Sequence, residues 1–240
     1  MILSRIFGRT NRIDGPEFAG LTDSHSHILP GVDDGIRTLE ESLAVLAEYE
    51  KMGFSDVWLT PHIMEDVPNT TSGLRDRFEA LTAAYNGHMT LHLGAENMID
   101  NLFMERLEAN DFLPVYDNML LVETSYFTPP INFHDTLRQI MLKGYIPLLA
   151  HPERYIYMDN EYYDNLREMG VKMQLNVLSL TGFYGKSAKT KAEYLAKSGM
   201  YALFGSDLHR ISQCEHLRKS AQMLHGKYCR SLIETNCINY

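Results

Sequence analysis

The 240-residue chain is poor in cysteine, in long apolar segments and in positive charge. Its three cysteines, Cys214, Cys229 and Cys237, form no CxxC pair, which argues against a disulfide framework or a zinc ribbon and fits a reducing cytoplasm. No segment has the length and apolarity of a membrane-spanning helix, and we expect residues 1–20 to be a lead-in rather than a secretory signal. The formal net charge of −9 argues against broad nucleic-acid binding.

Short apolar runs alternate with helical segments along the chain, which predicts a single α/β domain over residues 21–240. The predicted strands are Leu21–His25, Asp56–Thr60, Thr90–Leu93, Met119–Val122, Tyr145–Ala150, Lys172–Leu175 and Tyr201–Phe204. The predicted helices are Leu39–Met52, Gly73–Tyr85, Phe133–Leu142, Tyr162–Met169, Ala188–Lys197, Gln213–His225 and Tyr228–Thr235. This order favours a distorted seven-stranded (β/α)7 barrel of the TIM-like kind. An open doubly wound sheet remains the alternative, because periodicity does not decide whether a sheet closes.

Each predicted strand is followed by a residue that can bind a metal ion or a substrate. In (β/α) barrels the active site is built from the loops after the strands, so residues far apart in the chain would meet at one face. The joint occurrence at successive strand ends carries the argument, because one histidine or carboxylate after a strand is usually structural. The candidate metal ligands are His25, His27, Asp34, His62, Glu96, Glu123, His151, Asp207 and His209.

The types and spacing of these residues indicate several metal ions. Residues two apart in an extended backbone point the same way, so His25 and His27 can bind one ion, and Asp207 and His209 repeat the spacing. Imidazole and carboxylate without thiolate suit manganese, iron or zinc rather than calcium. Nine candidates exceed the needs of one ion, so we expect two to three divalent ions, most readily manganese, bridged by Glu96 or Asp207. Asp23 is a candidate for orienting an imidazole.

The motifs DSHSHILPGVDDG, TPH, GAEN, HPER and SDLH, in this order, resemble the PHP (polymerase and histidinol phosphatase) superfamily. Within it they resemble the bacterial PHP-type protein-tyrosine phosphatases of capsule and exopolysaccharide loci, from about Thr22 to His209. The resemblance implies a three-metal barrel with all nine candidates as ligands and a phosphate-binding Arg154. It places Arg37 in a loop facing the site. Residues 212–215 depart from the family's usual arginine and prolines, so Arg210 is a candidate for that anion contact, with a solvated residue at the start of a helix as the alternative.

The resemblance also implies a reaction and a partner. The expected substrate is phosphotyrosine, on the tail of a membrane-bound bacterial tyrosine kinase that controls polysaccharide export. We expect a metal-bridging hydroxide to attack phosphorus while Arg154 stabilises charge on the phosphoryl oxygens. A cysteine nucleophile is excluded, because Ser220 and Thr235 stand where a C-x5-R loop after Cys214 or Cys229 would need arginine.

Aromatic side chains near the predicted site offer a cleft for a phenyl ring, although core and loop packing explains them as well. They are Tyr126, Phe127, Tyr155 and Tyr184.

Three alternative functions remain open. Histidinol-phosphate phosphatase is a sister activity in the same superfamily, and a polymerase-associated nuclease is another, which the sequence pI of about 5.5 disfavours. A non-catalytic module that binds polysaccharide-machinery proteins is the alternative of a different class. It is disfavoured because every ligand position is filled.

Overall fold

The strands of the protein form two parallel sheets in a computed structural model that describes residues 15–226 and 228–236. The first sheet has the order β1-β2-β4, with bounds Thr22–Ser26, Asp56–Leu59 and Thr90–Leu93. The second has the order β3-β5-β6-β7-β8-β9. Its strands are His62–Ile63, Glu96–Met98, Met119–Glu123, Ile146–Ala150, Lys172–Asn176 and Tyr201–Gly205. Every pairing between these named strands is parallel, as an α/β fold requires.

The described residues contain nine strands where seven were expected, because two chain segments cross from one sheet to the other. β2 is followed after Thr60 and Pro61 by β3, and β4 is followed after Gly94 and Ala95 by β5. Pro61 has no N–H for a sheet hydrogen bond, and its carbonyl accepts from the Glu96 N–H at 3.1 Å. The short strands β3 and β5 then pair with His62 opposite Glu96, which places two candidate ligands side by side.

β1 and the end of β9 lie side by side, so the two sheets also meet there. The Asp207 N–H donates to the His25 carbonyl at 2.8 Å, and the His27 N–H donates to the Leu208 carbonyl at 2.9 Å. Gly205 allows this approach, because a Cβ atom at that position would collide with the Cβ atom of His25. The first and last candidate ligands are therefore neighbours in space.

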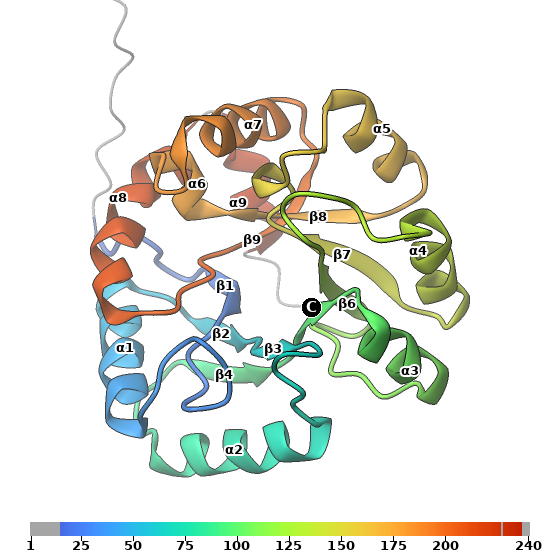
Figure 1. Cartoon of the computed structure of the whole chain (residues 1–240). Coiled ribbons are helices and arrows are strands. Elements are labelled where there is room, and N and C mark those ends of the chain that lie inside the picture. The colour runs from blue at the N-terminus through green and yellow to red at the C-terminus, as the bar shows by residue number, and fades with distance from the viewer. Residues whose placement is uncertain (1–14, 227, 237–240) are drawn as a thin grey trace, which may run out of the picture.

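Helices lie around the outside of the strands, as Figure 1 shows for α1 to α5 and α7. Helices α1 to α9 have the bounds Leu39–Met52, Thr71–Ala84, Asn101–Ala109, Phe133–Leu142, Asn160–Glu168, Val177–Thr181, Gly185–Lys197, Cys214–Leu224 and Arg230–Asn236. Short 3₁₀ turns span Pro152–Arg154 and Ile211–Gln213. Within the described ranges, each helix is too short or too polar to span a bilayer.

Capping residues explain where several helices begin and end. The Thr38 hydroxyl accepts from the Glu41 N–H at 3.2 Å at the start of α1, and the Glu41 carboxylate accepts from the Arg37 N–H at 3.4 Å. Four glycines that follow helices have positive φ, which ends the helix there: Gly53, Gly144, Gly170 and Gly199. Helix α3 was not predicted, although Asp100 caps it by accepting from the Phe103 N–H at 2.8 Å.

The core begins within the predicted lead-in. Residues 1–14 lie outside the described residues, but Phe18 is fully buried and stacks on Phe54 with a centroid separation of 4.5 Å. Its N–H also donates to the Met52 carbonyl at 2.8 Å. Phe18 therefore belongs to the core, although it lies within the predicted lead-in. Cys214 and Cys229 are buried free thiols, and Cys237 lies outside the described residues.

Candidate metal centre

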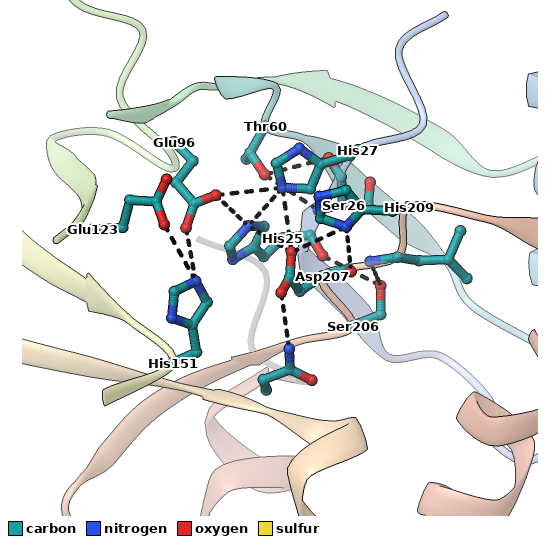
Figure 2. Close-up of polar contacts among 12 residues, drawn as sticks. His25, Ser26, His27, Thr60, Glu96, Glu123, His151, Ser206, Asp207 and His209 are labelled. Atoms are coloured by element: carbon teal, nitrogen blue, oxygen red, sulfur yellow. Dashed lines mark hydrogen bonds and ion pairs between the residues drawn. The ribbon is translucent and has the colours of Figure 1, made fainter. Parts of the chain in front are cut away.

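All nine predicted ligands meet at the carboxyl ends of the strands, where Figure 2 shows most of them converging. His25 lies in β1 and His27 directly after it, whereas Glu96 lies in β5 and Glu123 ends β6. His151 and Asp207 follow β7 and β9. Parallel strands bring these positions to one edge even though they are far apart in the chain.

The most deeply buried group of ligands is formed by His25, His27, Glu96 and Asp207, all almost completely buried. The Nε2 atoms of His25 and His27 are 3.1 Å apart. The His25 Nε2 lies 3.2 Å from Glu96 Oε2, and the His27 Nε2 lies 3.3 Å from Asp207 Oδ1. Two nitrogens and two carboxylates thus face a common centre, with ligand atoms within 4.8 Å of one another.

A second group shares Glu96 with the first. The His62 Nδ1 lies 3.0 Å from Glu123 Oε1 and 3.2 Å from Glu96 Oε2. The His151 Nε2 lies 3.0 Å from Glu96 Oε1 and 3.9 Å from Glu123 Oε2. Glu96 therefore faces imidazoles of both groups.

A third group is open to solvent. Asp34 Oδ1 lies 3.3 Å from the His209 Nε2 and 3.6 Å from the His62 Nε2, and the Asp34 side chain is 67% exposed. His27 completes this group from the buried side. The three groups share His27, His62 and Glu96, so they form one continuous centre.

Two of the imidazoles are oriented by side chains that sequence reasoning missed. The His27 Nδ1 pairs with Asp33 Oδ2 at 2.7 Å, and the His25 Nδ1 pairs with Gln174 Oε1 at 2.8 Å. Each contact leaves the Nε2 atom facing the centre, as in many metal sites where an outer partner fixes the ring. Asp33 stands beside Asp34 in VDDG, and Gln174 is a polar residue inside a predicted apolar strand. Both signals were present in the sequence.

Asp23, predicted as a possible imidazole partner, has another role. Its Oδ1 accepts from the Ser206 N–H at 2.8 Å and the His25 N–H at 3.2 Å, and its Oδ2 accepts from the Tyr49 hydroxyl at 2.8 Å. Burial raises the pKa of the Asp23 carboxyl. Asp23 therefore joins β1 to the segment that carries Asp207.

The charges at the centre favour bound positive charge. Burial lowers the pKa of His27, but Asp33 and the neighbouring carboxylates outweigh it and hold that pKa well above the usual value. Burial and His27 also lower the pKa of His62, yet Glu96 and Glu123 raise it to about 9. In the opposite sense, burial raises the pKa of Asp207, but the imidazoles of His27 and His25 outweigh it and lower that pKa.

Buried atoms without hydrogen bonds support a metal-binding role. Three buried atoms that face the centre, Glu96 Oε2, Glu123 Oε1 and His62 Nδ1, make close contacts at 3.0–3.2 Å but no hydrogen bond among the described residues. Leaving a buried polar atom without a hydrogen bond costs about 1–3 kcal/mol, and coordination to a cation would reduce that cost. The donor set is nitrogen and oxygen without sulfur, so it fits manganese, iron or zinc.

The backbone is strained at two of the candidate ligands. His151 has φ 35° and Asp207 has φ 52°, a left-handed region that residues with a Cβ atom rarely adopt. Such conformations cluster at functional sites because the surrounding structure must hold them in place.

Arg154 joins the centre through Asp207. Its Nη1 donates to Asp207 Oδ2 at 2.7 Å, and its guanidinium lies between the rings of Tyr126 and Tyr184, 4.5 and 4.1 Å from their centroids. The Asn176 amide donates both to Asp207 Oδ2 at 3.0 Å and to the Tyr184 hydroxyl at 3.2 Å. Burial lowers the pKa of Arg154, but Asp207 outweighs it and raises that pKa, so the cation is stable here.

The other two predicted arginines are exposed. The Arg37 N–H donates to Glu41 at 3.4 Å and the Arg210 N–H donates to Gln213 at 2.8 Å, so their described hydrogen bonds come from the backbone. The structure does not bring either guanidinium into the group around Asp207, and their roles stay predictions.

The other two predicted aromatic residues and Glu153 of the HPER motif differ in how deeply they are buried. Tyr155 is fully buried in the core, whereas Phe127 is 70% exposed. Glu153 is buried beside the centre, and its carboxylate accepts from the Ser179 hydroxyl at 2.8 Å and the Tyr201 hydroxyl at 2.9 Å. Glu153 is therefore a packing residue that holds the loop after β7 against the neighbouring strands.

A parallel α/β fold with a buried imidazole–carboxylate centre at its strand ends defines a class of candidate metal-dependent hydrolases. The chain belongs to the family described as capsular polysaccharide synthesis, CpsB/CapC, whose model matches residues 21–239. This match confirms the capsule-associated family predicted from the motifs.

Curated relatives in the family are named as phosphatases. Tyrosine-protein phosphatase CpsB of Streptococcus pneumoniae is 28% identical over 229 residues, covering 87% of this chain and 91% of its own. Tyrosine-protein phosphatase YwqE of Bacillus subtilis is 28% identical over 198 residues, covering 80% and 78%.

Solved structures agree with this placement. A chain from the structures of YwqE from Bacillus subtilis and CpsB from Streptococcus pneumoniae, described as unique metal-dependent tyrosine phosphatases, superposes with a TM-score of 0.80 at 25% identity. The match covers 89% of this chain and 92% of that chain. A lactonase from Listeria monocytogenes, with a TM-score of 0.54 at 12% identity over 92% and 88% of the two chains, shares the fold alone.

Proposed function

We propose that this protein is a metal-dependent phosphatase that removes phosphate from tyrosine residues of proteins. The observation that carries the proposal is the meeting of nine separated imidazoles and carboxylates in one centre, with Arg154 bound to its edge through Asp207. Family membership and the names of the relatives support phosphotyrosine as the substrate.

The centre would hold two to three divalent ions, manganese first, with iron or zinc as alternatives. Four of the candidate ligands are carboxylates, Asp33 adds a fifth beside His27, and Arg154 is the guanidinium in contact with them. With neutral imidazoles this leaves a net charge of about four negative units, which two divalent cations balance. The ions would be held by His25, His27, Asp34, His62, Glu96, Glu123, His151, Asp207 and His209.

The side chains divide the work of phosphate-ester hydrolysis. When bound, divalent cations supply a water of lowered pKa and neutralise charge on phosphoryl oxygens. Arg154 has five N–H donors, and one of them donates to Asp207. Other donors of the guanidinium would bind a phosphoryl oxygen of the substrate. The rings of Tyr126 and Tyr184, 4.5 and 4.1 Å from that guanidinium, help to hold it in position. Asp33 and Gln174 keep two imidazoles turned toward the centre.

The proposal extends to the partner, the compartment and the barrel. The substrate would be the phosphotyrosyl tail of a membrane-bound bacterial tyrosine kinase, met in the cytoplasm. The two parallel sheets, joined through β1 and β9 and through the segments after β2 and β4, would form a distorted (β/α)7 barrel in which β2–β3 and β4–β5 each count as one strand.

The test is hydrolysis of a phosphotyrosyl peptide by purified protein, measured with its metal content. We expect turnover with bound manganese, iron or zinc, loss of turnover with a chelator, and recovery on adding Mn²⁺. Faster hydrolysis of histidinol phosphate at matched concentration would move the substrate to the sister activity. Less than one bound ion together with inactivity in Mn²⁺ would favour a binding module.

A further inference from the structure

Large apolar side chains are exposed mainly at the end of the molecule that carries the centre. Among the described residues nine large hydrophobic side chains are exposed, and five of them lie in the connections that lead from β6, β7, β8 and β9 to α4, α5, α7 and α8. These five are Phe127, Ile131, Ile156, Phe183 and Ile211. Single exposed apolar residues are ordinary, but their gathering around a charged centre marks a surface used for binding.

Three of these side chains belong to the loops that meet at Arg154, and we call them the apolar rim: Phe127, Ile156 and Phe183. They are 70%, 63% and 42% exposed. Phe127 directly follows Tyr126, one of the rings on Arg154. Phe183 precedes Tyr184, the other ring, and contacts it with a centroid separation of 5.0 Å.

Ile156 is tied to the same place by the backbone. Its N–H donates to the Tyr126 carbonyl at 2.9 Å, and it stands two residues after Arg154. The rim residues therefore belong to three separate loops, and these loops are joined by the contacts of Arg154 with Tyr126 and Tyr184.

We propose that the apolar rim binds apolar side chains that flank the phosphotyrosine of a substrate polypeptide. The inference rests on the proposed function, because a phosphotyrosine at Arg154 carries its own chain onto the surrounding loops. An extended peptide advances about 3.3 Å per residue, so neighbours within about three positions of the phosphotyrosine lie close enough to reach the rim.

Charge favours a polypeptide with apolar rather than acidic flanks. The chain has a formal net charge of −9, and the ions held at the centre would balance only the carboxylates of the centre itself. Acidic flanks would meet this field as like charges, and so would an anionic lipid surface. Apolar flanking side chains would bury the apolar surface that the rim otherwise exposes to water, which favours their binding.

The test compares three substrates with the metal-loaded protein. Two are phosphotyrosyl peptides of equal length and charge, one with leucine and valine around the phosphotyrosine and one with serine. The third is p-nitrophenyl phosphate, which is too small to reach the rim. We expect kcat/KM to be about ten-fold higher for the apolar-flanked peptide than for the serine-flanked peptide.

Variants separate the rim from the reaction. Ile156→Ser and Phe183→Ser should each reduce the ratio between the two peptides, and together bring it close to one, with a smaller change for p-nitrophenyl phosphate. Leu142→Ser is the matched control, since Leu142 is 86% exposed at the end of α4. It should leave all three substrates unchanged.

Several results would overturn the inference. Equal kcat/KM for the two peptides, or an unchanged ratio in the double variant, removes the rim as a peptide site. If the peptide ratio stays at one and Phe183→Ser abolishes binding to vesicles, the rim is a membrane-binding surface instead. If Phe183→Ser abolishes dimer formation, the rim is an interface with a second copy of the chain. If no aryl phosphate is hydrolysed, the proposed function fails. The affinity of the protein for the two peptides is then measured by fluorescence anisotropy, and equal affinities would show that the rim does not bind apolar flanking residues.

Discussion

The two sides of the centre differ in how firmly their ligands are held. On the buried side, His25, His27, Glu96 and Asp207 have at most 2% of their surface exposed, and both imidazoles have a partner on the second ring nitrogen. On the open side the Asp34 side chain is 67% exposed and comes from a loop.

The buried side can therefore be formed before any ion binds. Its side chains are fixed by strands, by outer hydrogen bonds and by packing, so little conformational freedom remains to be lost. The open side keeps a carboxylate in contact with water, which suits entry of ions and substrate.

Removing a buried ligand should have the largest effect. Asp207→Ala deletes the carboxylate that faces the imidazoles of His25 and His27 and that binds Arg154. Because even outer partners of metal ligands are worth about 10–100-fold, we expect a loss of at least about 100-fold in kcat/KM toward a phosphotyrosyl peptide. Circular dichroism should show a folded protein. Activity within a few-fold of the native protein would remove Asp207 from the centre.

Removing an orienting partner should have the next largest effect. Asp33→Ala deletes the acceptor for the His27 Nδ1 and for the N–H groups of Gly35 and His62. We expect metal affinity to fall by about 10–100-fold, measured by competition with a chelator. Asp33→Asn keeps an oxygen acceptor and is the matched control, with a smaller loss expected. Equal losses in the two variants would assign the effect to charge rather than to orientation.

Much of the buried side could be predicted from the sequence, because short apolar runs show where the parallel strands end. Each predicted apolar run became a strand, and all nine candidate ligands were found together at the expected edge. The partition into two sheets could not be read, since it depends on where β2 and β4 bend at Pro61 and Gly94. Periodicity alone contains no information on such a crossing.

Outer contacts were predicted less well than ligands. Asp23 and Asp33 are both aspartates close to the HxH motif, and only the fold decides that Asp33 faces the His27 ring while Asp23 faces backbone N–H groups. The placement of Arg154 between two tyrosines likewise needed three loops from separate strands. Side-chain partners across loops are set by tertiary packing.

Removing the exposed ligand should have a smaller effect than removing Asp207. Asp34→Ala leaves the buried group of His25, His27, Glu96 and Asp207 complete. We therefore expect the number of bound ions to fall by about one and activity to fall roughly ten-fold, with partial recovery in excess Mn²⁺. Metal analysis after dialysis measures the stoichiometry. A loss as large as that of Asp207→Ala, without recovery, would mean that the two sides do not differ in function.

The smallest effect is expected at the ring that covers Arg154, which belongs to neither side. Tyr184→Ala removes a ring 4.1 Å from the guanidinium and the hydroxyl contacted by Asn176. A partly buried cation–π contact is worth about 0.5–2 kcal/mol, so KM and the inhibition constant of inorganic phosphate should rise roughly three- to ten-fold while kcat changes less. Tyr184→Phe keeps the ring and should retain most of the affinity. If Tyr184→Phe instead matches Tyr184→Ala, the hydroxyl bond to Asn176, rather than the stacked ring, holds Arg154 in position.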